Sequence, residues 1–257
     1  MTESAPPPKP AVPVTPSTSA TPSARATSSA PVTQAAPATS SAPSAPTAAD
    51  PAAPEFISRD PSAPDFWNER FARGVTPWDQ AGVPASFKTF AARQTPVPVL
   101  IPGCGNAWEA RWLAEQGWPV QAIDFSAAAV EHARAQLGPH ASLVELADFF
   151  RWRPPATPGW IYERAFFCAL PPARRADYAQ RMAELLPDGG LLAGFFFFAP
   201  TQKGPPFGIE RSELDALLEP YFDLLGDEAV TDSLPVFAGH ERWLTWRRRA
   251  SGSAPTA

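Results

Sequence analysis

Short apolar runs alternate with segments of helical pattern between residues 97 and 198, and this order limits the fold more than any other feature of the sequence. Runs of about four to eight apolar residues without polar alternation are typical of strands buried on both faces. Strands that alternate with helices in this way build a mostly parallel sheet. The sequence therefore predicts an α/β fold whose central sheet has helices on both faces.

Seven strands account for the apolar runs. They are predicted at residues 97–101, 119–123, 141–146, 160–167, 191–198, 222–230 and 236–246. The run at 191–198 is apolar throughout, which indicates a central strand. No helical pattern separates the last two runs in the sequence, so we expect them to pair as a C-terminal antiparallel hairpin.

Helical patterns with recognisable ends stand before and between the strands. They cover residues 66–71, 86–93, 106–116, 127–137, 171–186 and 213–218. Ser126 and Ser212 are predicted to cap the helices that follow them, because a serine side chain accepts hydrogen bonds from the free N–H groups of a first turn. Gly117 and Gly138 are predicted to end theirs.

The first 55 residues differ in composition from the rest of the chain. They consist almost entirely of Pro, Ala, Ser and Thr, with hardly a large apolar side chain. Such a segment buries too little apolar surface to offset the entropy lost on ordering. We therefore predict a disordered tail over 1–55, a folded domain over 56–249 and a disordered C-terminus over 250–257.

Charge and residue usage exclude several classes of partner. The net charge is −5, whereas binding to phosphate backbones needs a basic face, so no nucleic acid is expected. The N-terminus lacks the apolar segment of a secretory signal, and no run reaches the roughly 18 apolar residues of a membrane span. We expect a cytoplasmic monomer that acts on a small molecule and does not bind membranes.

Cysteine and histidine are too few and too scattered for a disulfide framework or a metal site. The two cysteines are Cys104 and Cys168. The histidines His132, His140 and His240 show no metal-ligand spacing, so no metal is expected. Cys104 is interpreted as a packing residue, and the role of Cys168 stays open.

Candidate ligand-binding residues follow the first three predicted strands. Gly103 and Gly105 lie in the turn after the first strand, Asp124 ends the second, and Asp148 and Phe149 end the third. Ligands of such sheets bind at the carboxyl ends of the strands. A carboxylate at Asp124 suits the two hydroxyls of a ribose, and Asp148 with Phe149 suits the amine and the face of an adenine.

Trp108 distinguishes between two kinds of cofactor that contain adenosine. It stands at the third glycine position of the dinucleotide motif G-x-G-x-x-G, where a large side chain obstructs the close approach of a pyrophosphate. A nicotinamide-dependent reductase is therefore disfavoured. S-adenosylmethionine has an adenosine and an amino-acid end but no phosphate, so it is the cofactor that we expect.

Six stretches of the chain resemble the thiopurine S-methyltransferase family of class I, Rossmann-like methyltransferases. They are VLIPGCG at 99–105, GVTPWDQ at 74–80, DFF at 148–150, FFCAL at 166–170, GPPF at 204–207 and GHERW at 239–243. The resemblance runs from about residue 65 to 248, with the motifs in the family's order. The VTPWDQ and FFCA pieces are similar to the branch of thiol and halide methyltransferases.

The resemblance implies roles for individual residues. The residues implied in cofactor binding are Trp67, Trp78, Gly103, Gly105, Asp124, Phe125, Asp148, Phe149 and Phe166. Trp67 and Trp78 are implied to cover the cofactor, with Trp78 also near the transferred methyl group and Phe166 near the methionine part. Arg164 matches a position where the thiopurine enzymes carry an arginine near the substrate. Glu163, just before it, stands where the family more often has aspartate.

The chemistry expected of these residues is methyl transfer by in-line displacement to a small soft nucleophile, namely a thiol, a halide or a thiopurine. Alignment and exclusion of water are the main tasks, because the leaving group of a sulfonium is already activated. A halide needs no base, and a thiol is partly ionised near neutral pH. Two alternatives stay open: methylation of selenium or tellurium species, and a non-catalytic cofactor-binding module whose proline-rich tail recruits a partner.

Overall fold

The computed structural model describes residues 55–201 and 203–251. The predicted disordered tail, apart from Glu55, lies outside the described residues, and so does the predicted disordered C-terminus from residue 252 onward. Within the described residues, no helix has the length and apolar character needed to cross a membrane.

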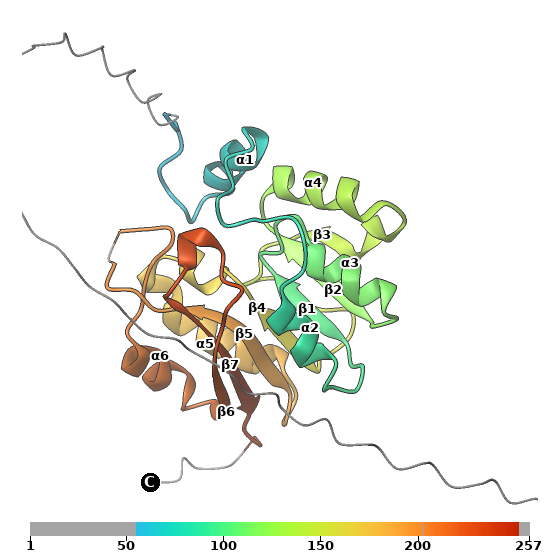
Figure 1. Ribbon diagram of the computed structural model, residues 1–257, viewed down its shortest axis with the longest axis vertical. Coiled ribbons are helices and arrows are strands. Elements are labelled where there is room, and N and C mark those ends of the chain that lie inside the picture. Colours follow the sequence, from blue (N-terminus) through green and yellow to red (C-terminus); the bar gives the residue numbers. More distant parts are fainter. Residues whose placement is uncertain (1–54, 202, 252–257) are drawn as a thin grey trace, which may run out of the picture. The chain divides into compact units, whose positions relative to one another are not determined.

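A seven-stranded mixed sheet forms the centre of the described domain, with the strand order β3-β2-β1-β4-β5-β7-β6 (Figure 1). The strands are β1 (Val99–Pro102), β2 (Val120–Asp124), β3 (Val144–Leu146), β4 (Trp160–Glu163), β5 (Leu191–Phe197), β6 (Phe222–Ala229) and β7 (Glu241–Arg248). The first five pair in parallel, and β7 runs antiparallel between β5 and β6. The predicted mostly parallel sheet with a C-terminal hairpin is confirmed.

Six α-helices and four short 3₁₀ helices connect the strands of the described domain. The α-helices are α1 (Pro64–Ala72), α2 (Ala85–Ala91), α3 (Trp108–Glu115), α4 (Ala127–Leu137), α5 (Arg175–Leu185) and α6 (Arg211–Leu218). The 3₁₀ helices are η1 (Gly138–Leu143), η2 (Phe167–Ala169), η3 (Pro172–Arg174) and η4 (Pro235–Phe237). Every helix predicted from the sequence is present: α4 has the predicted ends, and the others are displaced at one or both ends by one to four residues.

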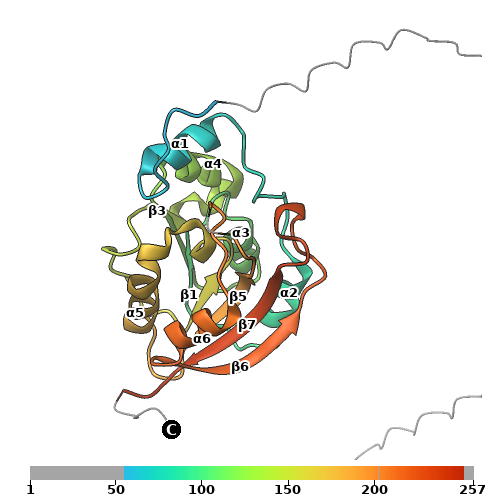
Figure 2. The same ribbon diagram turned by 90° about the vertical axis from the view of Figure 1, so that its left-hand side faces the viewer.

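The helices cover both faces of the sheet, and alternate residues of each strand feed the two cores. Val99 and Ile101 of β1 pack with residues of α2, α3 and α4, whereas Leu100 packs with residues of α5 and α6. Successive side chains of a strand point to opposite faces, so a strand that is covered on both sides must be apolar throughout. Figure 2 shows α5 on one side of the strands and α2 on the other.

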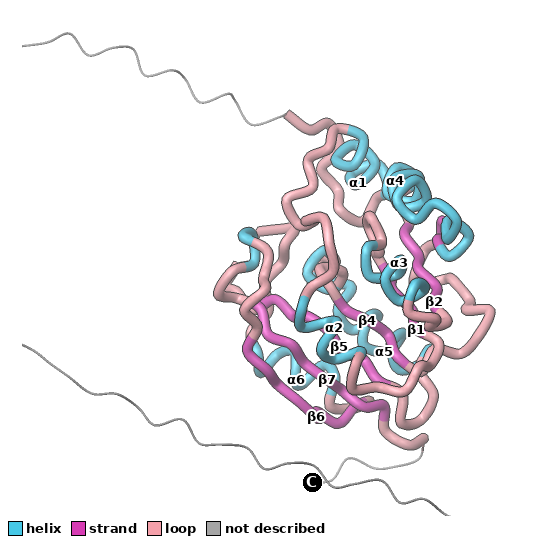
Figure 3. Tube along the Cα trace, turned by 45° about the vertical axis from the view of Figure 1, so that its right-hand side comes forward, coloured by secondary structure: helices cyan, strands magenta, loops and turns pink. Residues whose placement is uncertain are grey.

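Helix α1 packs against α4 at one end of the sheet (Figure 3). Ser126 caps α4 as predicted, because its side chain accepts the N–H of Ala129 at 3.2 Å, and Gly138 ends the helix with φ +53°. The Asn68 side chain of α1 accepts hydrogen bonds from the Ser126 hydroxyl and the Ala128 N–H at 2.8 and 3.2 Å. These bonds hold α1 over the end of β2.

Two strands are shorter in the structure than predicted: β3 begins later, and β4 ends earlier. The run at 141–146 is a strand only from Val144, because η1 occupies the residues after the turn at Gly138. The strand predicted at 160–167 ends at Glu163. Ala165 has a left-handed φ of +56°, and the Glu163 carboxylate accepts the backbone N–H groups of Phe166 and Phe167. Those N–H groups are therefore satisfied without a neighbouring strand.

Two further predictions about the C-terminal part were wrong. The last strand begins at Glu241 and not at residue 236, because Pro235 has no N–H to give to a ladder and η4 forms there instead. Ser212 lies inside α6, whose N-cap is Glu210, and no side chain caps that helix.

Candidate active site

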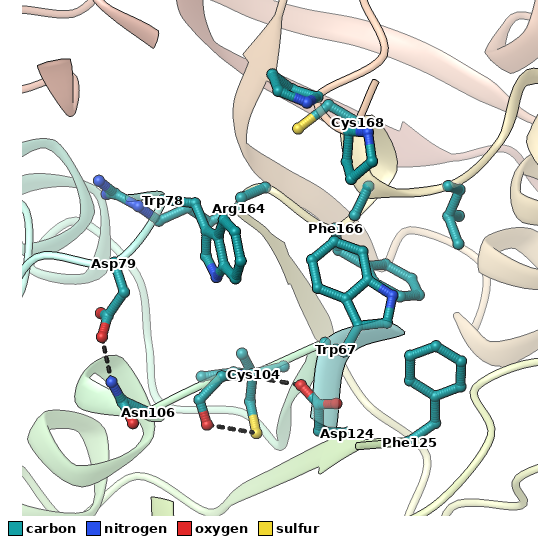
Figure 4. A pocket seen from close by; sticks show the side chains of 18 of the residues that line it. Trp67, Trp78, Asp79, Cys104, Asn106, Asp124, Phe125, Arg164, Phe166 and Cys168 are labelled. Atoms are coloured by element: carbon teal, nitrogen blue, oxygen red, sulfur yellow. Dashed lines mark hydrogen bonds between the residues drawn. The ribbon is translucent and has the colours of Figure 1, made fainter. Parts of the chain in front are cut away.

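A cavity of about 350 Å³ opens at the carboxyl ends of β1, β2 and β4, and every site residue predicted from the sequence lines it. Those residues are Trp67, Trp78, Gly103, Gly105, Asp124, Phe125, Asp148, Phe149, Arg164 and Phe166. Carboxyl ends of parallel strands share one edge of the sheet, which explains why residues up to about 100 positions apart meet there. The volume lies within the range of small-molecule sites, roughly 300–1,000 Å³. Figure 4 shows several of these predicted site residues around the pocket.

The glycine turn after β1 forms one wall of the cavity. Gly103 and Gly105 have φ of +58° and +52°, a conformation that residues with a side chain rarely adopt. A Cβ atom on Gly103 would lie 2.4 Å from the Phe166 ring. The glycine therefore lets the Phe166 ring lie directly on the turn.

Asp124 lies at the floor of the pocket, buried at the end of β2. Its Oδ2 atom accepts the N–H of Gly105 at 3.1 Å, and its Oδ1 atom accepts the N–H of Ser126 at 2.9 Å. Burial raises the pKa of Asp124 to about 6. A carboxylate has about four lone pairs, and Phe125 also donates a backbone N–H to it, so at least one acceptor position stays free for a bound ribose.

Aromatic rings and a second carboxylate form the adjoining wall. Phe149 is buried and meets the Phe166 ring edge to face, with centroids 5.1 Å apart. Asp148 is exposed, and its Oδ1 atom accepts the N–H of Phe150 at 2.9 Å. This wall has a flat apolar surface beside an exposed acceptor, which fits an adenine ring and its amine.

Two tryptophans from different segments cover the pocket. Trp67 of α1 and Trp78 of the loop before α2 pack edge to face, with ring centroids 5.4 Å apart. The Trp67 indole N–H donates to the Pro61 carbonyl at 2.9 Å. Both rings point into the pocket (Figure 4). They place an apolar, electron-rich surface where a positively charged methyl donor would lie.

Asp79, next to Trp78, is a site residue that the sequence reasoning missed. Its carboxylate accepts hydrogen bonds from the Asn106 side chain and, at 3.1 Å, from the Trp108 indole N–H. The first of these bonds is visible in Figure 4. Trp108 therefore does more than block a pyrophosphate: it fastens the loop that carries Trp78 to the glycine turn.

Glu163 is a second site residue without an expected role. It is buried, and one carboxylate oxygen accepts the N–H groups of Phe166 and Phe167 at 3.0 and 2.9 Å while the other accepts the Tyr178 hydroxyl at 2.7 Å. Burial raises the pKa of Glu163 to about 7. The carboxylate positions the turn from which Phe166 reaches the cavity.

Arg164 and Cys168 lie across the pocket from Cys104 and Asp124 (Figure 4). The Arg164 guanidinium lies 4.5 Å from the centre of the Phe195 ring, and its buried Nη1 atom has no hydrogen-bond partner among the described residues. Burial raises the pKa of both cysteine thiols well above the usual range, so they stay protonated at neutral pH. The geometry favours Cys104 and Cys168 as packing residues.

Further apolar residues line the cavity, some from the FFCAL and GPPF stretches and others outside every family motif. Those that line the cavity are Ala165, Ala169, Leu170, Pro171, Pro205, Pro206, Leu234, Val236 and Phe237. Phe167 and Phe207, which belong to the FFCAL and GPPF stretches, do not line the cavity. Phe167 packs in the core against Tyr178, with ring centroids 4.8 Å apart. No group of three or more possible metal ligands occurs among the described residues.

Comparison with known proteins adds the following. Residues 62–249 match the sequence profile of the thiopurine S-methyltransferase family. A probable thiol methyltransferase 2 of Arabidopsis thaliana is 32% identical over 64% of this chain and 74% of its own. Thiocyanate methyltransferase 1 of Brassica oleracea is 30% identical over 71% of this chain and 84% of its own.

A solved structure resembles the fold at low sequence identity. It is the 1,6-didemethyltoxoflavin-N1-methyltransferase of Burkholderia thailandensis with its substrate and S-adenosylhomocysteine bound. It superposes with a TM-score of 0.59 and 18% identity, covering 72% of this chain and 87% of its own. The predicted Rossmann-like class I methyltransferase fold is confirmed by this likeness and by the strand order.

Proposed function

Because the chain belongs to the thiopurine S-methyltransferase family, as its match over residues 62–249 shows, we propose that it methylates a small soft nucleophile, namely a thiol, a halide ion or a thiopurine. The chain is an S-adenosylmethionine-dependent methyltransferase. The relatives named as thiol and thiocyanate methyltransferases support a small, soft sulfur nucleophile as the acceptor.

The residues of the pocket fit the cofactor in a consistent arrangement. We propose that Asp124 holds the ribose hydroxyls and that Asp148, with Phe125 and Phe149, holds the adenine. Gly103 and Gly105 would let the backbone approach the amino-acid end, beside Phe166. Trp67 and Trp78 would cover the sulfur. The buried carboxylate of Asp124 and the left-handed conformation of the two glycines beside it support this assignment.

The chemistry asks little of the protein beyond alignment. When bound, S-adenosylmethionine would supply a methyl group on a positively charged sulfur. That sulfur is a good leaving group and needs no further activation. The residues of this chain orient the acceptor in line and keep water out, which is the main source of rate for such displacements. Arg164 is proposed to hold the acceptor by its charge, so that a thiolate or halide lies at the apolar end of the cavity.

One observation carries the proposal: the residues assigned to the cofactor and the cationic Arg164 line the same cavity, together with largely apolar and aromatic residues. A soft, polarisable anion fits such a surface better than a hard oxygen nucleophile, which needs several hydrogen bonds to replace its hydration.

The test is a methyl-transfer assay with the purified full chain, S-adenosylmethionine and a panel of iodide, thiocyanate, bisulfide, thiophenol and a thiopurine. S-adenosylhomocysteine is measured as the common product. Turnover with any of these supports the proposal, and their order of kcat/KM identifies the natural class. Tight binding of S-adenosylhomocysteine without turnover on the whole panel would refute it.

The two alternatives are separated by the same assay. Methylation of selenium or tellurium species, which the same pocket chemistry permits, is tested by adding selenite and tellurite and is not favoured by the relatives. A non-catalytic module would bind S-adenosylhomocysteine and give no product. The cytoplasmic location and the monomeric state expected from the sequence stay predictions, which cell fractionation and light scattering would test.

A further inference from the structure

Glu241 is a buried carboxylate that the proposed mechanism does not use. It is the first residue of β7, opposite Phe197 of β5, and only 8% of it is exposed. The next residue, Arg242, is half-exposed and forms an ion pair with Asp227 on β6. A charged group at a buried strand position destabilises the fold unless it has partners, so the partners of the Glu241 carboxylate matter for its role.

The partners of Glu241 leave part of its charge unsatisfied. Ser233 donates a hydrogen bond to the carboxylate, but the Oε2 atom is buried and has no hydrogen-bond partner among the described residues. Among the described residues, Arg164 is the positive charge that acts on Glu241, and its buried Nη1 atom also has no hydrogen-bond partner there. No ion pair within 4.0 Å joins the two residues in the described part of the chain, so each influences the other across a gap.

Glu241 lies behind the residues that line the acceptor end of the pocket. It does not line the cavity itself, yet its charge acts on Arg164 and on Cys168, which both do. Its strand partner Phe197 packs with Cys168, Leu234 and Phe237 around the same end. Glu241 therefore acts on an acceptor through Arg164 and is not placed to touch it.

Other titratable groups surround this pair from each neighbouring element. Glu109 of α3 and Tyr162 of β4 face Arg164 and act on it more strongly than Glu241 does. Tyr162 forms a hydrogen bond with Arg164, and its hydroxyl donates to Glu109 at 3.2 Å. Asp232, in the loop before η4, faces Glu241 and repels it. His240 precedes Glu241 on the exposed side and contacts the Phe198 carbonyl.

We propose that Glu241 determines when the pocket accepts anions: its ionised carboxylate competes with an anionic acceptor for Arg164, and its protonated form leaves Arg164 free to hold that acceptor. This inference rests on the proposed function, because it assigns Arg164 to the acceptor. Glu241 is thus a specificity-determining residue that works through another side chain.

The pH range follows from the environment of Glu241. Burial, the largest effect, raises its pKa to about 7, although Ser233 and Arg164 lower it. As the pH rises through 7 the carboxylate becomes charged, so the affinity for an anion falls. By reciprocity, a bound anion raises the pKa of Glu241, because the two negative charges repel each other.

The experiment measures the Michaelis constant for iodide, or thiocyanate, between pH 5.5 and 8.5 on the full chain. Neither anion titrates in this range, and each serves as a competitive inhibitor if it is not itself methylated. S-adenosylmethionine is kept at a saturating concentration at every pH. A change in the ionisation of Asp124 then does not alter the constant measured for the anion. We expect the KM or Ki to rise about tenfold through pH 7 with little change in kcat.

Glu241→Gln, which imitates the protonated carboxylate, should give a low and pH-independent KM. Three variants serve as comparisons and should keep the rise of KM through pH 7, which is called the step below. Glu241→Asp retains a carboxylate at the same position. His240→Gln changes the neighbouring residue, and Glu228→Gln changes an exposed carboxylate of β6. A step that disappears in His240→Gln or Glu109→Gln, but not in Glu241→Gln, would assign it to another group and overturn the proposal.

Two outcomes separate this inference from the proposed function. Turnover with a KM that is flat across the pH range in the unmodified protein overturns the role of Glu241 and leaves the function standing, whether or not Glu241→Gln folds. No product and no inhibition with any acceptor at any pH overturns both.

Discussion

Buried carboxylates at the ends of two strands shape the site, residue by residue. Asp124 and Glu163 each accept two backbone N–H groups from the turn that follows their strand or a neighbouring one. A carboxylate in this position replaces the ladder partner that a longer strand would provide. The result is that Gly105 and Phe166, which line the cavity, are held by side chains from β2 and β4.

Asp124→Ala should weaken the binding of S-adenosylhomocysteine by roughly tenfold to a hundredfold, since hydrogen bonds to a charged acceptor are lost from the ligand and from the glycine turn. Calorimetric titration measures the dissociation constant. Glu131→Ala, which removes an exposed carboxylate of α4, is the matched control and should bind as the unmodified chain does. Unchanged affinity in Asp124→Ala would contradict the cofactor assignment.

Glu163→Gln should change how stability depends on pH. The pKa of Glu163 is raised from the ordinary 4.5 to about 7 by burial, so its contribution to stability is fully present below pH 4.5 and is lost as the pH rises to 7. Glutamine does not ionise and keeps an oxygen for the N–H groups of Phe166 and Phe167.

The free energy of unfolding of Glu163→Gln, minus that of the unmodified chain, should therefore increase between pH 4.5 and 7, by up to about 3 kcal/mol. Urea denaturation at pH 5 and pH 8 provides the comparison. A difference that stays constant, or decreases with pH, would mean that the buried carboxylate is not destabilised in its charged form.

At the scale of elements, the pocket is closed by segments that come before the sheet in sequence. Helix α1 is held to the start of α4 by Asn68, and the loop with Trp78 is held to the start of α3 by Asp79. Both attachments lie beside the glycine turn and Asp124. Movements of the cover and of the cavity walls are therefore coupled by a few polar contacts.

Asp79→Ala should speed the release of S-adenosylhomocysteine, because the loop with Trp78 loses its attachment to Asn106 and Trp108. Trp108→Phe removes the indole N–H together with part of the ring system, keeps an aromatic side chain and should have a smaller effect in the same direction. Combined, the two changes should cost less than the sum of the single ones, since both break the same hydrogen bond.

Stopped-flow fluorescence measures the release rates for this cycle. Trp112→Phe, which changes another half-buried tryptophan of α3, should leave the rate unaltered. Strict additivity of Asp79→Ala and Trp108→Phe would show that the contact between them does not act on the cover.

At the scale of the whole molecule, the described domain begins with an anchored segment. The Glu69 carboxylate accepts the N–H groups of Ile57 and Ser58 at about 3.0 Å, and Arg73 donates to the Glu55 carbonyl at 2.7 Å. Arg70 lies over the Phe56 ring at 4.2 Å. Residues 55–58 thus support the α1 helix that carries Trp67.

Removal of residues 1–54 should leave kcat/KM and the melting temperature unchanged, because that stretch of sequence offers almost no apolar surface to bury. Removal of residues 1–60 should lower both, since it takes away the partners of Glu69, Arg70 and Arg73. Scanning calorimetry and the methyl-transfer assay on the two truncated chains test this pair. A large loss with the shorter truncation would contradict the first expectation.

The sequence alone determined the sheet, the hairpin and the strand ends at which the proposed cofactor residues stand. Apolar runs such as residues 191–197 have only one arrangement that buries both faces, and a parallel sheet brings all its strand ends to one edge. Asp124 and Asp148 were therefore predictable as neighbours, and the family motifs added Trp67, Trp78 and Arg164.

Only the tertiary structure decided which polar groups meet across the pocket. Asp79 is one acid among many until the loop before α2 folds onto Trp108, and Glu241 reads as a surface carboxylate until β7 inserts beside β5. The ends of β4 and β7 were equally undecided, because side-chain hydrogen bonds and left-handed residues compete there with strand pairing. These contacts join residues far apart in sequence, and no local pattern records them.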